Sequence, residues 1–173
     1  MADKNTRTVL FVCTGNSCRS AMAKGLLEDL VSRRQDELRE KVPGVQVVVR
    51  SAGVMALPGF AASAGAIEAM RETGIDISFH LTQPLTNEMI DEADLILVME
   101  ERHLEEIINR RPGARDKAFL LKIYGLHEEE GGKLADRDVA DPIGKPLEGY
   151  QCSLAEIREY VERVFEKFIL EKE

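Results

Sequence analysis

The chain has 173 residues and a formal net charge of −8, and its length suits a single domain with a core of ordinary size. Hydrophobic residues make up 44% and charged residues 31% of it, as in globular proteins that fold in water. The negative charge argues against nucleic acid as a partner, because nonspecific binding needs a basic face. No apolar run approaches the ~18 residues of a membrane-spanning helix, so no membrane partner is expected. The polar start MADKNTR lacks the apolar core of a signal peptide.

The cysteine content indicates the redox compartment. Cys13, Cys18 and Cys152 are too few, and odd in number, for a disulfide framework. They favour a reducing compartment, so we expect a cytoplasmic protein. No cysteine or histidine cluster has the spacing of a zinc site, and no metal site is expected.

Hydrophobic periodicity predicts strands that alternate with helices. In chain order these are a strand at 9–12, a helix at 20–35, a strand at 45–49, a helix at 61–72, a short helix at 87–91, a strand at 95–99, a helix at 101–110, a strand at 118–121 and a terminal helix at 153–170. Thr86 suits the N-cap of the short helix, and the polar residues at 128–141 predict a surface loop. The alternation predicts an open four-stranded parallel sheet with helices on both faces, a Rossmann-like α/β fold in one domain over residues 1–173.

The stretch VLFVCTGNSCRS at 9–20 is the most informative, because it places a thiol between a buried strand and a helix. The first N–H groups of a helix are unpaired and the helix dipole adds positive charge there, so an anion is favoured. A Cys13 thiol at that position ionises more readily. The planar guanidinium of Arg19 can hold two oxygens of a phosphate-like group. Together they indicate phosphoryl transfer by a cysteine nucleophile that needs no metal.

Two other interpretations of this stretch are weaker. A nucleotide-binding P-loop needs the pattern G-x-x-x-x-G-K-[ST], and Gly15 has no such partner. A core cysteine followed by an ordinary arginine in the first helical turn would account for each residue alone. It would not account for the C-x5-R-S spacing between a strand and a helix.

Four landmarks stand in the order found in the low-molecular-weight protein tyrosine phosphatases: CTGNSCRS at 13–20, RSAG at 50–53, LILVM at 95–99 and the pair Asp141–Pro142. From Val9 to the terminal helix the sequence resembles that family. The resemblance implies the family's fold and a phosphoprotein phosphatase that forms a phosphocysteine without a cofactor. It also implies a phosphorylated protein as substrate and inorganic phosphate or a similar oxyanion as a ligand of the cysteine loop. A monomer is the simplest expectation.

The resemblance also implies roles for single residues. Cys13 is the nucleophile, Arg19 binds the phosphate, and Asp141 acts as general acid and then as general base. Two neighbouring carboxylates, Asp136 and Asp138, are competitors for the acid. Backbone N–H groups of the loop complete the phosphate cradle; the loop residues are Thr14, Gly15, Asn16, Ser17, Cys18 and Arg19.

Four residues are expected to hold this loop in shape. Asn16 suits a strained backbone, because asparagine tolerates positive φ and bonds locally. In the family its counterpart pairs with the residue that matches Ser51, supported by the residue that matches His80. Ser20 is expected to donate a hydrogen bond to the Cys13 thiolate, the alternative being a capping role at the helix start.

The resemblance further implies that Cys18 is a redox partner that forms a reversible disulfide with Cys13. A low-pKa thiolate beside a second thiol is the physical requirement for such a bond. The alternative for Cys18 is a small apolar filler, and Cys152 is expected to be structural.

The substrate is expected to be phosphotyrosine or phosphoarginine, with a slight preference for phosphoarginine. Tyrosine-directed members often carry a bulky aliphatic residue where Ser17 stands, and two aromatics after Asp-Pro that clamp a phenyl ring. Here DPIGKP has Ile143 and no aromatic, and Tyr150 is the residue that could replace them. The arginine phosphatases of the superfamily carry CTGNTCRS and DPFGG, and Ser17 keeps the hydroxyl of that threonine. RSAGV and HLTQPLT also look more like that branch.

Two other functions stay open. Arsenate reductases of the same fold carry an identical CTGNSCRS loop, but they need two further cysteines after the third strand, and 100–111 contains none. A noncatalytic module that binds phosphorylated residues needs neither a Cys13 thiolate nor an Asp141 acid. The sequence therefore favours the phosphatase over both.

Overall fold

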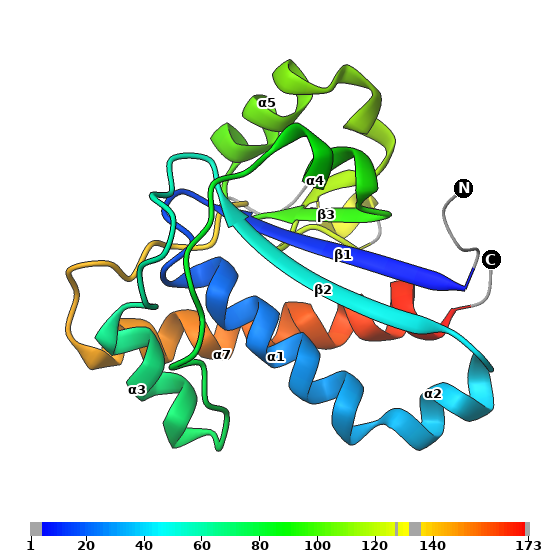
Figure 1. Ribbon diagram of the computed structural model, residues 1–173, viewed down its shortest axis with the longest axis horizontal. Coiled ribbons are helices and arrows are strands. Elements are labelled where there is room, and N and C mark those ends of the chain that lie inside the picture. The colour runs from blue at the N-terminus through cyan, green and yellow to red at the C-terminus, as the bar shows by residue number, and fades with distance from the viewer. Residues whose placement is uncertain (1–4, 127, 132–135, 172–173) are drawn as a thin grey trace.

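A computed structural model describes residues 5–126, 128–131 and 136–171. At its centre is a four-stranded parallel sheet in the order β2-β1-β3-β4 (Figure 1). The strands are β1 (Thr6–Cys13), β2 (Gln46–Gly53), β3 (Leu95–Val98) and β4 (Ala118–Leu120). The open parallel sheet predicted from the sequence is confirmed, and each predicted strand overlaps an observed one.

Parallel pairing brings the carboxyl ends of the strands to one edge of the sheet. In β1, one of the two inner strands, Cys13 pairs with Gly53 of β2 and Val12 pairs with Val98 of β3. Residues 9–12 of β1 are fully buried, as expected for a continuous apolar run between two helical layers. The segments that follow β1, β2 and β3 therefore meet at this edge, where open α/β sheets bind their ligands.

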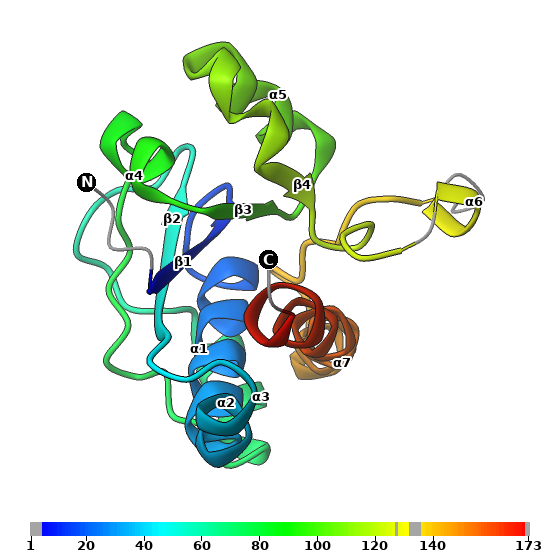
Figure 2. The same ribbon diagram turned by 90° about the vertical axis from the view of Figure 1, so that its right-hand side faces the viewer.

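Helices cover both faces of the sheet (Figure 2). One face carries α1 (Arg19–Arg33), α3 (Ala64–Glu72) and α7 (Leu147–Val164), and the other carries α4 (Asn87–Glu92) and α5 (Glu101–Arg110). Alternate side chains of β1 serve the two cores, because successive residues of a strand point to opposite faces. Val9 and Phe11 pack in the first core, and Leu10 and Val12 pack in the second.

Smaller helical elements connect or extend these helices. They are α2 (Gln35–Lys41), η1 (Pro112–Asp116), α6 (Glu128–Gly131) and η2 (Phe165–Leu170). The predicted N-cap is confirmed, since the Thr86 side chain accepts a hydrogen bond from the backbone N–H of Met89. Across the described ranges, no helix has the length and apolar character needed to cross a lipid bilayer.

Several predicted boundaries were wrong. The first helix stops at Arg33, because Arg34 leaves helical geometry at φ −105° and ψ 26° before α2 begins. The terminal helix starts at Leu147, directly after Pro146, and not at 153. The predicted loop at 128–141 contains the short helix α6, and its residues 132–135 lie outside the described part of the chain.

The core assignment predicts the effect of a truncation in α1. Leu27 is fully buried in the core that β1 shares with α7, so Leu27→Ala should lower the free energy of unfolding by about 2–5 kcal/mol through lost burial and a residual cavity. Leu57 is 68% exposed, and Leu57→Ala should change this free energy by less than about 0.5 kcal/mol. Urea denaturation measures both values. Equal losses in the two variants would contradict the assigned core.

Candidate active site

The loop after β1 brings a thiol and a hydroxyl together at the start of α1. Sγ of Cys13 lies 2.9 Å from Oγ of Ser20, and it accepts a hydrogen bond from the backbone N–H of Asn16 at 3.2 Å. The cysteine is 3% exposed. Both neighbours can donate to a thiolate, which is the nucleophilic form of cysteine.

Asn16 gives the loop an unusual backbone conformation. Its φ of 57° lies in the left-handed region, which disfavours most residues with a Cβ. The buried side-chain amide donates to Oγ of Ser20 and to Oγ of Ser51, each at 2.9 Å, and Oδ1 accepts from the backbone N–H of Gln83 at 3.0 Å. The shape of the loop therefore depends on residues of α1, β2 and the segment before α4.

His80 supports the same asparagine through its backbone. Nε2 of His80 lies 2.7 Å from the carbonyl oxygen of Asn16. Burial lowers the pKa of this imidazole, so the ring is neutral near pH 7 and its Nε2–H group donates to the carbonyl. This geometry suits a supporting residue and gives His80 no contact with the Cys13 sulfur.

The end of β2 approaches the loop so closely that a side chain would not fit there. A Cβ on Gly53 would lie 2.5 Å from the carbonyl oxygen of Thr14 and 2.9 Å from the backbone nitrogen of Asn16. The glycine of the RSAG motif is therefore required by packing against the loop.

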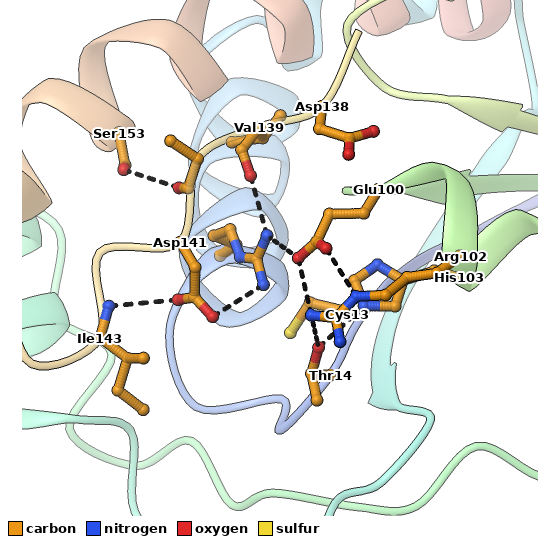
Figure 3. A network of polar contacts seen from close by, with 12 residues as sticks. Cys13, Thr14, Glu100, Arg102, His103, Asp138, Val139, Asp141, Ile143 and Ser153 are labelled. Carbon is orange, nitrogen blue, oxygen red and sulfur yellow. Dashed lines mark hydrogen bonds and ion pairs between the residues drawn. The ribbon is translucent and has the colours of Figure 1, made fainter. Parts of the chain in front are cut away.

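Arg19 carries a buried positive charge into the site. Its side chain is 2% exposed, and Nη1 donates to Oε1 of Glu100 at 2.5 Å and to the carbonyl oxygen of Val139 at 2.8 Å (Figure 3). Nη2 donates to Oδ2 of Asp141 at 3.0 Å. A buried guanidinium is stable only with such partners, and this arrangement brings Arg19 and Asp141 together.

Glu100, directly after the strand predicted at 95–99, is the main anionic partner of this guanidinium. Besides Arg19 it binds Arg102, whose Nε donates to Oε2 at 2.6 Å and whose Nη2 donates to Oε1 at 3.1 Å. Burial alone would raise the pKa of Glu100, but the hydrogen bonds from Arg102 and Arg19 outweigh it and lower the pKa to about 2. Glu100 is therefore ionised at neutral pH.

The three candidate acids occupy different positions. Asp141 contacts Arg19, and its Oδ1 accepts from the backbone N–H of Ile143 at 3.1 Å. Oδ1 of Asp138 instead accepts from the backbone N–H of Glu101 at 2.9 Å and so caps α5. Asp136 accepts from the backbone N–H of Asp138. Of these three carboxylates, Asp141 is the one that the structure brings to Arg19.

The second thiol of the loop has other neighbours. Sγ of Cys18 lies 3.0 Å from Oγ of Ser63, the N-cap residue of α3, and 3.6 Å from Oγ of Ser17. The backbone N–H of Ser63 donates to the carbonyl oxygen of Ser17 at 2.9 Å. Cys152 lies exposed on α7. The disulfide between Cys18 and Cys13 stays a prediction.

Tyr150 does not offer an exposed ring for stacking. It is buried in the core, where its ring packs so tightly against Gly65 of α3 that a Cβ there would lie 2.4 Å from the ring. Ile143, after Asp141–Pro142, is exposed. The aromatic clamp that the sequence lacks after Asp141 is therefore not replaced by Tyr150.

Glu100, Gln83 and His103 also lie in the site, although no sequence motif pointed to them. Glu100 and His103 follow β3 at the carboxyl edge of the sheet, and this position is the signal that could have identified them. Gln83 acts partly through its backbone N–H, which no sequence pattern reveals. Among the described residues, no group of three or more His, Cys, Asp and Glu side chains could hold a metal ion.

The lowered pKa of Glu100 predicts a pH effect on stability. Its pKa falls from an ordinary value of 4.5 to about 2 on folding, so its contribution is complete above pH 4.5 and is lost as the pH falls towards 2. This loss amounts to about 3 kcal/mol and should be absent in Glu100→Gln. Urea denaturation between pH 6 and pH 2 measures it, with Glu101→Gln as the exposed control. Parallel pH curves for the parent and Glu100→Gln would contradict the assignment.

Comparisons with known proteins agree with this geometry. The family model of the low molecular weight phosphotyrosine protein phosphatases matches residues 8–173. The chain is 39% identical over 164 residues to a protein-arginine-phosphatase of Geobacillus stearothermophilus, which covers 95% of this chain and 97% of the relative. It is 38% identical over 156 residues to a probable low molecular weight protein-tyrosine-phosphatase, EpsP, of Ralstonia nicotianae, covering 90% and 92%.

A solved structure extends the likeness to three dimensions. Vibrio vulnificus Wzb in complex with benzylphosphonate matches with a TM-score of 0.75 and 31% sequence identity, over 94% of this chain and 99% of that one. Relatives named for either activity stand at nearly equal identity, so the comparisons do not separate phosphoarginine from phosphotyrosine. They do establish that the chain belongs to the low molecular weight phosphotyrosine protein phosphatase family.

Proposed function

We propose that the chain is a phosphoprotein phosphatase that forms a phosphocysteine on Cys13, with Arg19 binding the phosphate and Asp141 exchanging the proton. The observation that carries this proposal is the meeting of a hydrogen-bonded thiol, a buried guanidinium and a carboxylate at one edge of the sheet. Family membership supports it, since the relatives are named protein-tyrosine and protein-arginine phosphatases. A cytoplasmic location, a monomeric state and the redox role of Cys18 belong to the same proposal.

The chemistry divides into two displacements at phosphorus. In the first, Sγ of Cys13 attacks phosphorus, the bond to the leaving oxygen or nitrogen breaks, and Asp141 gives its proton to the leaving atom. In the second, Asp141 takes a proton from water, the water oxygen attacks phosphorus, the S–P bond breaks and phosphate leaves. Arg19 and the N–H groups of the loop stabilise the negative charge on the remaining oxygens in both steps.

We propose phosphoarginine as the preferred substrate, with phosphotyrosine second. Ser17 offers a small hydroxyl where a bulky aliphatic residue would favour a phenyl ring. The segment after Asp141 contributes Ile143 and no aromatic ring, and Tyr150 is buried. A phenyl ring of phosphotyrosine would therefore have few aromatic surfaces to stack against. The guanidinium of phosphoarginine depends less on such stacking, so its binding would be weakened less.

The role of Cys13 predicts the effect of removing its sulfur. Cys13→Ser should lower the turnover of a phosphorylated peptide by a factor on the order of 10³ or more, because a serine hydroxyl is far less acidic and less nucleophilic. The variant should still bind oxyanions, since the loop N–H groups and Arg19 remain. Phosphate release measures turnover, and Cys152→Ser is the matched control. Substantial turnover by Cys13→Ser would refute the phosphocysteine.

The role of Asp141 predicts a dependence on the leaving group. Asp141→Asn should slow aryl phosphates with poor leaving groups by about 10²–10⁴-fold, and those with good leaving groups much less, because only the former need a proton. Steady-state rates for a series of aryl phosphates measure the slope, with Asp136→Asn as the control in the same loop. An equal loss for every leaving group would argue against a proton donor.

The substrate proposal predicts the outcome of a direct competition. The parent should hydrolyse a phosphoarginine peptide with a kcat/KM about tenfold above that of the matched phosphotyrosine peptide, a difference of about 1.4 kcal/mol. Ser17→Thr should keep this preference, and Ser17→Ile should shift it towards phosphotyrosine. Phosphate release is measured with Cys13→Ser as the blank. Faster turnover of phosphotyrosine by the parent would overturn the assignment.

A further inference from the structure

A buried histidine of α5 contacts the residue that follows Cys13. His103 lies on the buried side of α5 together with Ile107, and its side chain has no exposed surface. Nε2 lies 2.8 Å from Oγ1 of Thr14 (Figure 3). Nδ1 is buried and has no hydrogen-bond partner in the part of the chain that the structure describes. The contact with Thr14 is therefore the polar interaction that this imidazole makes.

The unpaired nitrogen indicates which tautomer is present. Burial lowers the pKa of His103 to about 4, although the charge of Glu100 opposes this, so the ring is neutral near pH 7. A proton on Nδ1 would leave a buried N–H group unpaired, and such groups are rarer in proteins than unpaired acceptors. The proton therefore lies on Nε2, which donates to the hydroxyl of Thr14.

Thr14 is held from two sides. Its Oγ1 also lies 3.1 Å from Nη2 of Arg102, so both donors to this hydroxyl come from α5. Its carbonyl oxygen accepts from the backbone N–H of Met55 at 2.9 Å, beyond the end of β2. The Thr14 carbonyl belongs to the peptide group between Thr14 and Gly15, so these contacts fix the Thr14 side chain and orient the N–H group of Gly15, directly after Cys13.

We propose that His103 is a positioning residue of the active site: its Nε2–H group holds the Thr14 hydroxyl and so fixes the start of the phosphate-binding loop relative to Cys13. The inference rests on the proposed function of that loop. His103 contacts no reacting atom, and its effect reaches the substrate through Thr14.

The test replaces first the donor and then the acceptor of the hydrogen bond between His103 and Thr14. His103→Leu removes the donor and should lower kcat/KM about tenfold, whereas His103→Gln keeps an N–H donor near the Nε2 position and should stay within about threefold of the parent. Thr14→Val removes the hydroxyl and should cost about as much as His103→Leu, while Thr14→Ser keeps it. In a Thr14→Val background, His103→Gln and His103→Leu should have the same kcat/KM, because the hydroxyl group that the Gln amide would bind is absent.

Controls separate positioning from stability. Ile107→Val is a buried change on the same helix, and it should lower the melting temperature without changing kcat/KM measured well below that temperature. If His103→Leu fails to fold, the difference in kcat/KM between Thr14→Val and Thr14→Ser still tests whether the Thr14 hydroxyl matters. Parent-like kcat/KM in His103→Leu or Thr14→Val would overturn the inference, as would a Gln–Leu difference that persists without the hydroxyl. A parent that shows no turnover above Cys13→Ser would refute the proposed function and the inference together.

Discussion

The buried guanidinium of Arg19 is the constraint on which the active site depends. Water cannot reach a side chain that is 2% exposed, so protein groups must balance its charge and its N–H donors. They come from two places far from Arg19 in the sequence: Glu100 after β3, and Val139 and Asp141 in the segment before α7. The end of β3, that segment and α1 are therefore held together by one side chain. In the proposed function, a phosphate adds its negative charge to the same group.

The shape of the cysteine loop depends equally on residues outside it. A left-handed backbone at Asn16 costs about 1 kcal/mol or more. The hydrogen bond that Asn16 donates to Ser51, and those that it accepts from Gln83 and His80, offset that cost. Ser51 reaches the loop because β2 pairs with β1 in a register that places Cys13 opposite Gly53. The sheet register and the loop conformation thus require each other, and a peptide of the loop alone would not keep this form.

The sequence predicted the parallel sheet well, because apolar runs of strand length are unambiguous when helices separate them. Cys13 and Asp141 could be found because their motifs are local. Glu100 and His103 carry no such motif, and an acid and a histidine at the start of an amphipathic helix look like solvated residues, so their position after a predicted strand was the one signal for them. The pairing of β3 with β1 brings both residues next to the cysteine loop. The start of α7 was missed although Leu147 and Tyr150 continue the apolar steps of three and four, because Pro146 and Gly149 favour a loop there.

The two carboxylates that bind Arg19, those of Glu100 and Asp141, have different roles in the proposed mechanism. Glu100 is 16% exposed, with a pKa of about 2, and stays charged at neutral pH, so Arg19 keeps an anionic partner whichever protonation state Asp141 has. Asp141 is 37% exposed and binds Arg19 through a single oxygen. In the proposed mechanism it must lose and regain a proton, and Glu100 allows this without leaving a buried charge unpaired. The permanently charged carboxylate lies directly before α5, and the proposed proton carrier lies on the segment before α7.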